Sequence, residues 1–230
     1  VSGMQLWVDL PEQLRDVKPR YRDLRSYEIP ETTQDDGKVK VKVILGNSYG
    51  VESLHDLAYT PVEYYYVNIA PGGKFEQKLD PSKNFFLYVL KGHQLAVNDN
   101  KVGQHHTIFF NRDGDKLEVV NPSGGDAAEF VVIGGEVLDQ KSLQYGPFVA
   151  GSQGKIQEAF MDYQYGRNGF ENVKTWDSLI SDGVKKEMLP ELGGGEEVRR
   201  DFEAKYKAKC DIEAKAAAEA KAGKGEKDEL

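Results

Sequence analysis

Cysteine is nearly absent from this chain of 230 residues, which contains a single one, Cys210. One thiol excludes an intramolecular disulfide framework and a thiolate metal cluster within one chain. The sequence also has no run of about 18 apolar residues, the length that a membrane-spanning helix needs. It begins with Val1 rather than methionine, and no charged-then-apolar signal peptide follows, so we expect a fragment or a processed product.

Basic residues are also in short supply. The chain has 30 Lys and Arg against 38 Asp and Glu, a net charge of −8. A protein that binds nucleic-acid phosphates normally presents a basic face, so we expect no direct nucleic-acid binding, and any role at DNA would run through another protein. Apolar residues make up 39% of the sequence, with twelve Tyr and ten Phe, which is enough for a packed core.

The middle of the chain has the pattern of an antiparallel β protein. KVKVKVIL, from residue 38, alternates Lys and Val as a strand with one wet face does. Turn signals, such as Pro-Gly-Gly at 71–73 and Asn-Asp-Asn at 98–100, separate the later candidates. These are PVEYYYVNI, NFFLYVL, HQLAV, HTIFF, KLEVV and EFVVIGGEVL. Many short strands with regular turns predict an all-β sandwich or barrel, which we place at residues 37–150.

Different patterns flank this region. Residues 1–36 hold one short apolar strand, QLWVDL, and a connector that three prolines interrupt. Residues 151–185 predict a helical closure. Its first helix is capped by Ser152 and stopped by Gly166, and its apolar face is Ile156, Ala159, Phe160 and Tyr163. A second short helix is predicted in NVKTWDSLI, with Trp176 and Leu179 packed inward. Residues 186–230, rich in Ala, Glu and Lys, predict a solvated charged helix that frays at its end.

The stretch PGGKFEQKLDPSKNFFLYVLKG, residues 71–92, has the glycine spacing of a metal-binding β-barrel motif. The motif is Gly, five residues, His-x-His, a Glu after three or four more residues, and a closing Gly after another six. Counting from Gly72, the His positions hold Lys78 and Asp80, and the Glu position holds Phe85. A second motif follows in Arg-Asp-Gly at 112–114, where the His position holds Leu117. The two spacings together resemble those of the cupin barrels.

The residues at these positions do not have the chemistry of the motif. Alternate residues of a strand point to one face, so His-x-His sends two imidazoles into a barrel, where a Glu and a second His complete the site. Protonated Lys offers no lone pair, and Phe and Leu offer no ligand. We therefore predict no metal site, with Phe85 and Leu117 packed inside. If Lys78 and Asp80 point inward, we expect them to form an ion pair.

Two other patterns in the sequence could indicate a functional site. Gly46-Asn47-Ser48-Tyr49-Gly50 matches the nucleophile elbow G-x-S-x-G, but no long helix follows it, and a β-turn between strands is the favoured interpretation. The four histidines are His55, His93, His105 and His106. Neighbours on a strand point to opposite faces, so the adjacent pair cannot share one metal. Ordinary surface or hydrogen-bonding roles are favoured for all four.

Several further segments resemble the pirin family: GMQLWVDLP followed by PRYRDL, the His-His-Thr at 105–107, and QYGPFVAGSQGKIQEAFMDYQYGRNGF. Pirins are bicupins, whose N-terminal barrel holds one iron through three His and one Glu and whose C-terminal barrel is metal-free. This chain resembles the connector and the C-terminal barrel. The resemblance therefore implies no cofactor here, iron only in an upstream barrel that is missing, and a strand near Trp7 that packs on that barrel.

The same resemblance implies two functions. Some pirins are regulators in the cytoplasm and nucleus that bind transcription factors or signalling proteins, and others are flavonol (quercetin) dioxygenases. We expect a non-catalytic, metal-free barrel with a structural and protein-binding role. The alternative is part of a dioxygenase, with a flavonol bound only if the upstream barrel is present. The ending Lys227-Asp228-Glu229-Leu230 matches a retrieval signal of the ER lumen. We interpret it as accidental, with an ER-lumenal location as the alternative.

Overall fold

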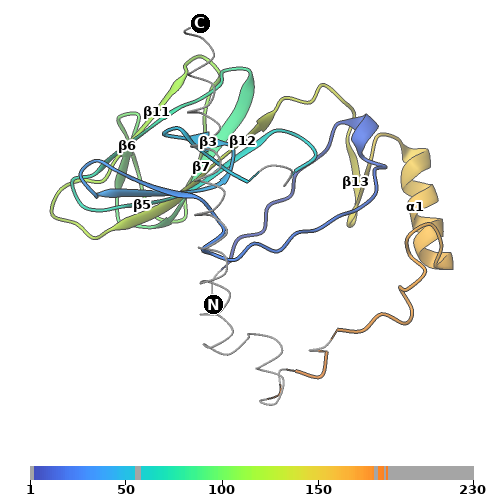
Figure 1. Ribbon diagram of the computed structural model, residues 1–230. Helices are drawn as coiled ribbons and strands as arrows, with labels where there is room; N and C mark the ends of the chain where they lie inside the picture. The colour runs from blue at the N-terminus through green and yellow to red at the C-terminus, as the bar shows by residue number, and fades with distance from the viewer. Residues whose placement is uncertain (1–2, 55–57, 179–180, 184, 186–230) are drawn as a thin grey trace, which may run out of the picture. The chain divides into compact units, whose positions relative to one another are not determined.

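The computed structural model describes residues 3–54, 58–178, 181–183 and 185 (Figure 1). The chain divides into two compact units, residues 1–160 and 161–230. The first unit contains the strands and most of the one α-helix of the described residues, α1 (Gln153–Tyr165). No helix in the described ranges has both the length and the apolarity needed to cross a lipid bilayer.

Two antiparallel sheets form the body of the first unit, and the predicted all-β, cupin-type fold class is confirmed. The six-stranded sheet has the spatial order β1 (Glu31–Gln34), β2 (Val39–Leu45), β5 (Val62–Ile69), β12 (Ala128–Glu136), β7 (Lys83–Lys91) and β10 (Thr107–Phe109). The four-stranded sheet has the order β6 (Lys74–Lys78), β11 (Lys116–Val120), β8 (Leu95–Val97) and β9 (Asn100–Val102). Two small hairpins, β3 (Asn47–Ser48) with β4 (Val51–Glu52) and β13 (Leu143–Tyr145) with β14 (Phe148–Ala150), complete the unit.

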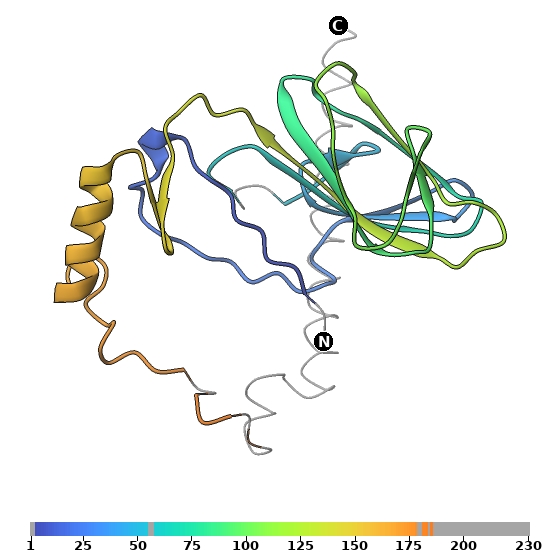
Figure 2. The same cartoon turned by 180° about the vertical axis from the view of Figure 1, so that it is seen from behind.

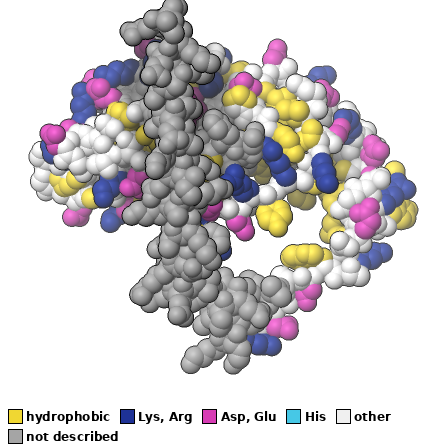
Figure 3. All heavy atoms as spheres, viewed as in Figure 1, with side chains coloured by type: hydrophobic (Ala, Val, Ile, Leu, Met, Phe, Trp, Pro, Cys, Tyr) yellow, Lys and Arg dark blue, Asp and Glu magenta, His cyan; other side chains and the backbone are white. Residues whose placement is uncertain are grey.

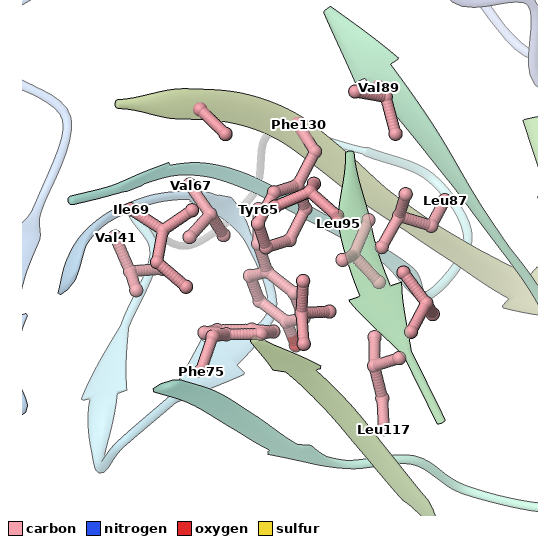
Figure 4. Close-up of a cluster of buried hydrophobic side chains, with 14 of the residues drawn as sticks. Val41, Tyr65, Val67, Ile69, Phe75, Leu87, Val89, Leu95, Leu117 and Phe130 are labelled. Carbon is pink, nitrogen blue, oxygen red and sulfur yellow. The ribbon is translucent and has the colours of Figure 1, made fainter. Parts of the chain in front are cut away.

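The core lies between these two sheets (Figure 4). The Lys-Val alternation of β2 buries its valines and leaves the lysines at or near the surface, as a period-two pattern requires. The rings of Phe75 on β6 and Phe130 on β12 meet edge to face across the core, with centroids 5.6 Å apart. The buried cluster draws aliphatic and aromatic side chains from both sheets, so the sequence pattern and the packing agree.

The N-terminal segment differs from its prediction. Residues 3–11 form no strand, and only a short 3-10 turn follows at Glu12–Leu14. The expected strand around Trp7 is therefore wrong, since the segment joins no ladder that would satisfy its backbone. The first strand of the sheet, β1, instead begins at Glu31, inside the predicted connector. Its Thr and Gln residues carried no apolar alternation that would have predicted it.

The C-terminal helices are partly as predicted. In α1 the Lys155 amide donates to the Ser152 hydroxyl at 3.3 Å, and Gly166, at φ +64°, follows the last turn, so both predicted ends are confirmed. The second helix is wrong within the described residues, because 171–178 form only turns, and Trp176 is 74% exposed. Its Leu179 and the predicted helix beyond 186 lie outside the described residues.

The outer face of the four-stranded sheet carries a ring of four charges from β6 and β11. Lys74 contacts Glu76 at 2.9 Å and Glu118 at 3.0 Å, and Lys116 contacts the same two carboxylates at 2.8 and 3.3 Å. The hydrogen bonds from Lys116 and Lys74 lower the pKa of Glu76 to about 2. Because all four groups face water, the ring keeps this face soluble more than it stabilises the fold.

Glu76→Gln tests the pH dependence of this ring. The pKa of Glu76 in the folded protein lies below its ordinary value of 4.5. The ionised carboxylate therefore contributes its full stabilisation of the fold above pH 4.5, and this stabilisation is lost as the pH falls towards 2. Wild type should be slightly more stable than the variant at neutral pH, and the difference should shrink with added salt and vanish near pH 2. Denaturant unfolding across this range measures it. Glu158→Gln, on the exposed side of α1, is the control, and an equal pH-dependent difference there would contradict the assignment.

Candidate functional site

The predicted His-x-His positions lie on and just after β6, but they face the solvent. Lys78 and Asp80 are exposed, whereas Gln77 and Leu79 between and before them are buried. The ion pair between Lys78 and Asp80 was expected only if both side chains point inward, and that condition is not met. Asp80 instead accepts hydrogen bonds from the Ser82 hydroxyl at 2.7 Å and the Ser82 amide at 2.9 Å, which lower the pKa of its carboxyl. Counting from Gly72 reproduces the glycine spacing of the motif, but it assigns the inward positions to Lys78 and Asp80, whose side chains point outward.

The other two predicted positions are part of the core. Phe85 on β7 and Leu117 on β11 are 4% and 0% exposed. Phe85 lies opposite Gly134 of β12 in the antiparallel register, and its ring covers that glycine so closely that any Cβ there would collide with it. The missing side chain of Gly134 thus provides the space that the aromatic ring fills. An apolar contact occupies the position where a cupin metal site would have its carboxylate.

Gln77 is the polar group among these inward positions, and its amide is already bonded. The Ser48 hydroxyl, itself fully buried, donates to Gln77 Oε1 at 2.7 Å. Gln77 Nε2 donates to the carbonyls of Asn47 and Lys78, both at 3.2 Å. This bonding fixes the β3–β4 hairpin against β6. Gln77 thus acts as a structural link, with its oxygen and nitrogen both engaged.

The same hairpin shows whether the G-x-S-x-G segment is a nucleophile elbow or a turn between strands. Ser48 pairs with Val51 across a two-residue turn, in which Tyr49 and Gly50 both have positive φ. No helix follows, and the Ser48 hydroxyl is directed at Gln77 rather than at a base. The interpretation as a turn between strands is confirmed.

A cavity of about 890 Å³ opens beside the β3–β4 hairpin, where β5 and β7 begin and β6 ends. Its wall includes a largely buried ion pair, in which Lys83 Nζ lies 2.8 Å from Glu63 Oε1. The Tyr65 hydroxyl lies 2.7 Å from the other carboxylate oxygen, and burial raises the pKa of this phenol. The cavity therefore has charged groups that neutralise one another, and it lacks a nucleophile hydrogen-bonded to a base.

The histidines of the described residues do not converge. His105 Nδ1 lies 3.2 Å from the Tyr88 hydroxyl, and His106 Nδ1 lies 2.9 Å from the Gln104 carbonyl, both at the surface. His55 lies outside the described residues. Among the residues described, no three His, Cys, Asp or Glu side chains are grouped to hold a metal ion. The side chains that point into the core supply a single amide, that of Gln77, which is already hydrogen-bonded, and the others are apolar. This set of groups does not fit iron.

A polar cluster that the sequence did not predict joins the N-terminal segment to Gln140. In Figure 2 the dark blue N-terminal segment runs beside the yellow segment that contains β13 and β14. The Arg15 guanidinium grips Asp9 with two hydrogen bonds, at 2.7 and 3.1 Å. Gln140 Nε2 donates to Asp9 at 3.2 Å and to the Leu10 carbonyl at 2.8 Å, and its oxygen accepts from the Glu12 amide at 2.8 Å. We call Asp9, Arg15 and Gln140 the clasp. It connects residues about 130 positions apart, which no local pattern could reveal.

Exposed aromatic side chains flank the clasp. Trp7 and Tyr145 are each 62% exposed, and Tyr145 packs edge to face on Phe160 of α1 at 5.5 Å. A groove of about 310 Å³ separates Trp7 and its neighbours from Phe86 and Ile133 of the six-stranded sheet. Hydrophobic side chains are visible on the surface of this part of the unit in Figure 3. Tyr145 and Phe160 are in contact, whereas Trp7 lines this groove; we refer to these three exposed residues together as the aromatic platform.

Phe85→Ala measures what the filled interior contributes. Emptying a buried aromatic site should lower the free energy of unfolding by about 3–5 kcal/mol, because Gly134 offers no side chain to close the void. Denaturant unfolding at neutral pH is the measurement. Phe86→Ala, the next residue, which faces away from the core and is only half-buried, is the matched control and should cost clearly less. Equal losses would contradict the placement of Phe85.

Comparison with known proteins agrees with this geometry. The family model of the pirin C-terminal cupin domain matches residues 64–169. Human pirin is 35% identical over 181 residues, 77% of this chain and 61% of the human protein. Pirin-1 of Arabidopsis thaliana is 35% identical over 176 residues, 75% of this chain and 60% of that protein. The chain therefore spans about 60% of the length of these relatives.

A crystal structure of quercetin 2,3-dioxygenase from Acinetobacter baumannii superimposes with a TM-score of 0.65 at 22% identity. The match covers 71% of this chain and 56% of that one, and it shows a shared fold. Together with the sequence relatives, it explains why the two sheets carry cupin spacing around an apolar interior. The chain is similar in sequence to the pirins over about three quarters of its length, and its residues 64–169 match the C-terminal cupin domain of that family.

Proposed function

We propose that this chain is a non-catalytic, metal-free cupin domain of a pirin-like protein, with a structural and protein-binding, regulatory role. The observation that carries the proposal is the interior at the motif positions. Gln77 is bonded to Ser48, and Leu79, Phe85 and Leu117 are buried apolar side chains. Each buried apolar residue contributes roughly 1.5–3 kcal/mol, so the domain is stable without the bonds that a metal would supply.

The protein-binding part of the proposal rests on the aromatic platform and the clasp. The clasp holds the connector against the β13–β14 region, so Trp7 and Tyr145 are presented by ordered backbone. An upstream cupin domain of the intact protein would pack on this platform, and transcription or signalling proteins would be the regulatory partners. The corresponding location is the cytoplasm and nucleus. A working Lys227–Leu230 signal would instead place the protein in the ER lumen; these four residues lie outside the described ones.

The alternative function is part of an iron-dependent flavonol dioxygenase whose metal site lies in an upstream domain. The likeness in fold to a protein named quercetin 2,3-dioxygenase favours it, as does the span of about 60% of the pirin relatives. The reading frame of the gene tests this alternative. The absence of three His and one Glu at cupin spacing before Trp7 would exclude the dioxygenase and leave the regulatory role, whereas their presence would be compatible with both functions.

Metal analysis of the purified chain tests the proposed function. Elemental analysis should find no iron, manganese or zinc in stoichiometric amount, because the inward side chains supply no ligand set. Incubation with quercetin and added iron(II) should leave the flavonol intact, as followed by its absorbance. One metal per chain that is lost on replacing His93 or His105 would contradict the proposal, since the surface histidines would then form a site.

Dye binding tests the aromatic platform. The chain should bind a hydrophobic fluorescent dye in its native state, because exposed apolar patches are marks of an uncovered interface. The double variant Trp7→Lys with Tyr145→Lys should reduce the fluorescence strongly, while Tyr21→Lys, 92% exposed but away from the platform, is the matched control. Equal fluorescence in the wild type and the platform variant would refute this role.

A further inference from the structure

The outer strands of the two sheets differ in how they are protected. A strand at a sheet edge has unpaired backbone groups, and natural proteins usually shield it with charge or proline. Three of the four outer strands carry charged residues: β1 has Glu31 after Pro30, β9 has Lys101, and β6 has several. The fourth, β10, is Thr-Ile-Phe and lies in an uncharged run, residues 104–111. Its edge is therefore left open to pairing.

The free edge of β10 can be assigned residue by residue. The Val89 amide donates to the His106 carbonyl, and the Phe110 amide donates to the Phe85 carbonyl, so His106 and Phe110 direct their backbones towards β7. Alternation along an antiparallel strand directs Ile108 the same way. The amides and carbonyls of Thr107 and Phe109 therefore point away from β7, towards the side of the sheet on which the described residues provide no further strand.

The side chains at this edge are apolar where they face water. Phe109 is 77% exposed, the highest value among the phenylalanines of the described residues, and its ring packs at 5.7 Å on Phe86 of β7. Ile108 and Phe110, on the other face, pack against the core. The edge thus combines backbone groups that point away from β7 with an exposed Phe109 that rests on the half-buried Phe86, and both features favour strand addition.

We propose that β10 pairs with β10 of a second copy of this chain, antiparallel, around a two-fold axis at Ile108. In this register Thr107 of one copy lies opposite Phe109 of the other, and each pair exchanges both backbone hydrogen bonds. The two six-stranded sheets become one continuous sheet. Phe86 and Phe109 of both copies then form a single aromatic row on its outer face.

We choose a second copy of this chain as the partner because the edge of β10 is able to pair with itself. A two-fold interface places each segment opposite itself, so a charged edge would bring like charges together. The run 104–111, which contains no Asp, Glu, Lys or Arg, avoids that repulsion when its two histidines are neutral, whereas β1, with Glu31 and the two aspartates at 35–36, does not. Because few residues pair, the interface is small, and the dimer should be weak and should depend on protein concentration.

Sedimentation or light scattering over a wide range of concentrations tests the proposal on the full chain. Wild type should shift from monomer to dimer as the concentration rises. Phe109→Lys places a charge beside its symmetry mate and should weaken the dimer by at least about tenfold in Kd. Thr107→Pro removes an amide donor that β7 does not use, and it should weaken the dimer while circular dichroism and thermal unfolding remain those of the wild type.

Two control variants make the outcome decisive. Thr33→Lys changes an exposed residue on the opposite outer strand of the same sheet, and Tyr145→Lys changes the aromatic platform. Both should leave the dimer unchanged. A wild type that is monomeric at every concentration would overturn the proposal. A dimer that survives Phe109→Lys, or one that only Tyr145→Lys disrupts, would also overturn it, and the second result would assign association to the platform.

Discussion

The contact between Phe85 and Gly134 is the constraint on which the rest of this domain depends. The ring of Phe85 on β7 lies over Gly134 on the neighbouring strand β12, and any residue with a Cβ at position 134 would collide with that ring. With that space filled, apolar side chains from both sheets form a continuous buried core, and several polar groups lie at one end of it. The buried Ser48–Gln77 bond and the Glu63–Lys83 pair lie there, each with its partner supplied by the fold.

The body of the fold could be predicted because its strands are long enough to show a period. KVKVKVIL and PVEYYYVNI have buried alternate residues that identify β2 and β5 directly. The short strands β1, β3 and β9, of two to four residues, show no period and were not predicted. The equally short β8 and β10 were found because they lie within the apolar stretches HQLAV and HTIFF. The segment around Trp7 shows the opposite error, because apolar content suggested a strand for which the described residues offer no pairing partner.

The sequence predicted which types of residue occupy the candidate site, but it did not predict which of their side chains point into the core. The motif spacing directed attention to the segment that contains β6 and the start of β7, and residue types alone led us to expect no ligand set there. A shift of one residue on a strand exchanges inside and outside, so Lys78 and Asp80 were placed inward where Gln77 and Leu79 lie. The clasp was missed for a different reason. Its members are ordinary polar residues that acquire meaning only when the fold brings Gln140 to Asp9.

If the domain is metal-free, as we propose, the glycine at 134 would also make a metal centre hard to gain in single steps. A glutamate at 85 would bury an unpaired carboxylate and leave a void over Gly134, and both changes destabilise before any metal can compensate. Histidines at 77 or 79 would in turn break the bond to Ser48 or enlarge a side chain in a packed interior. Each of these single changes should therefore lower the stability of the fold before a complete ligand set exists.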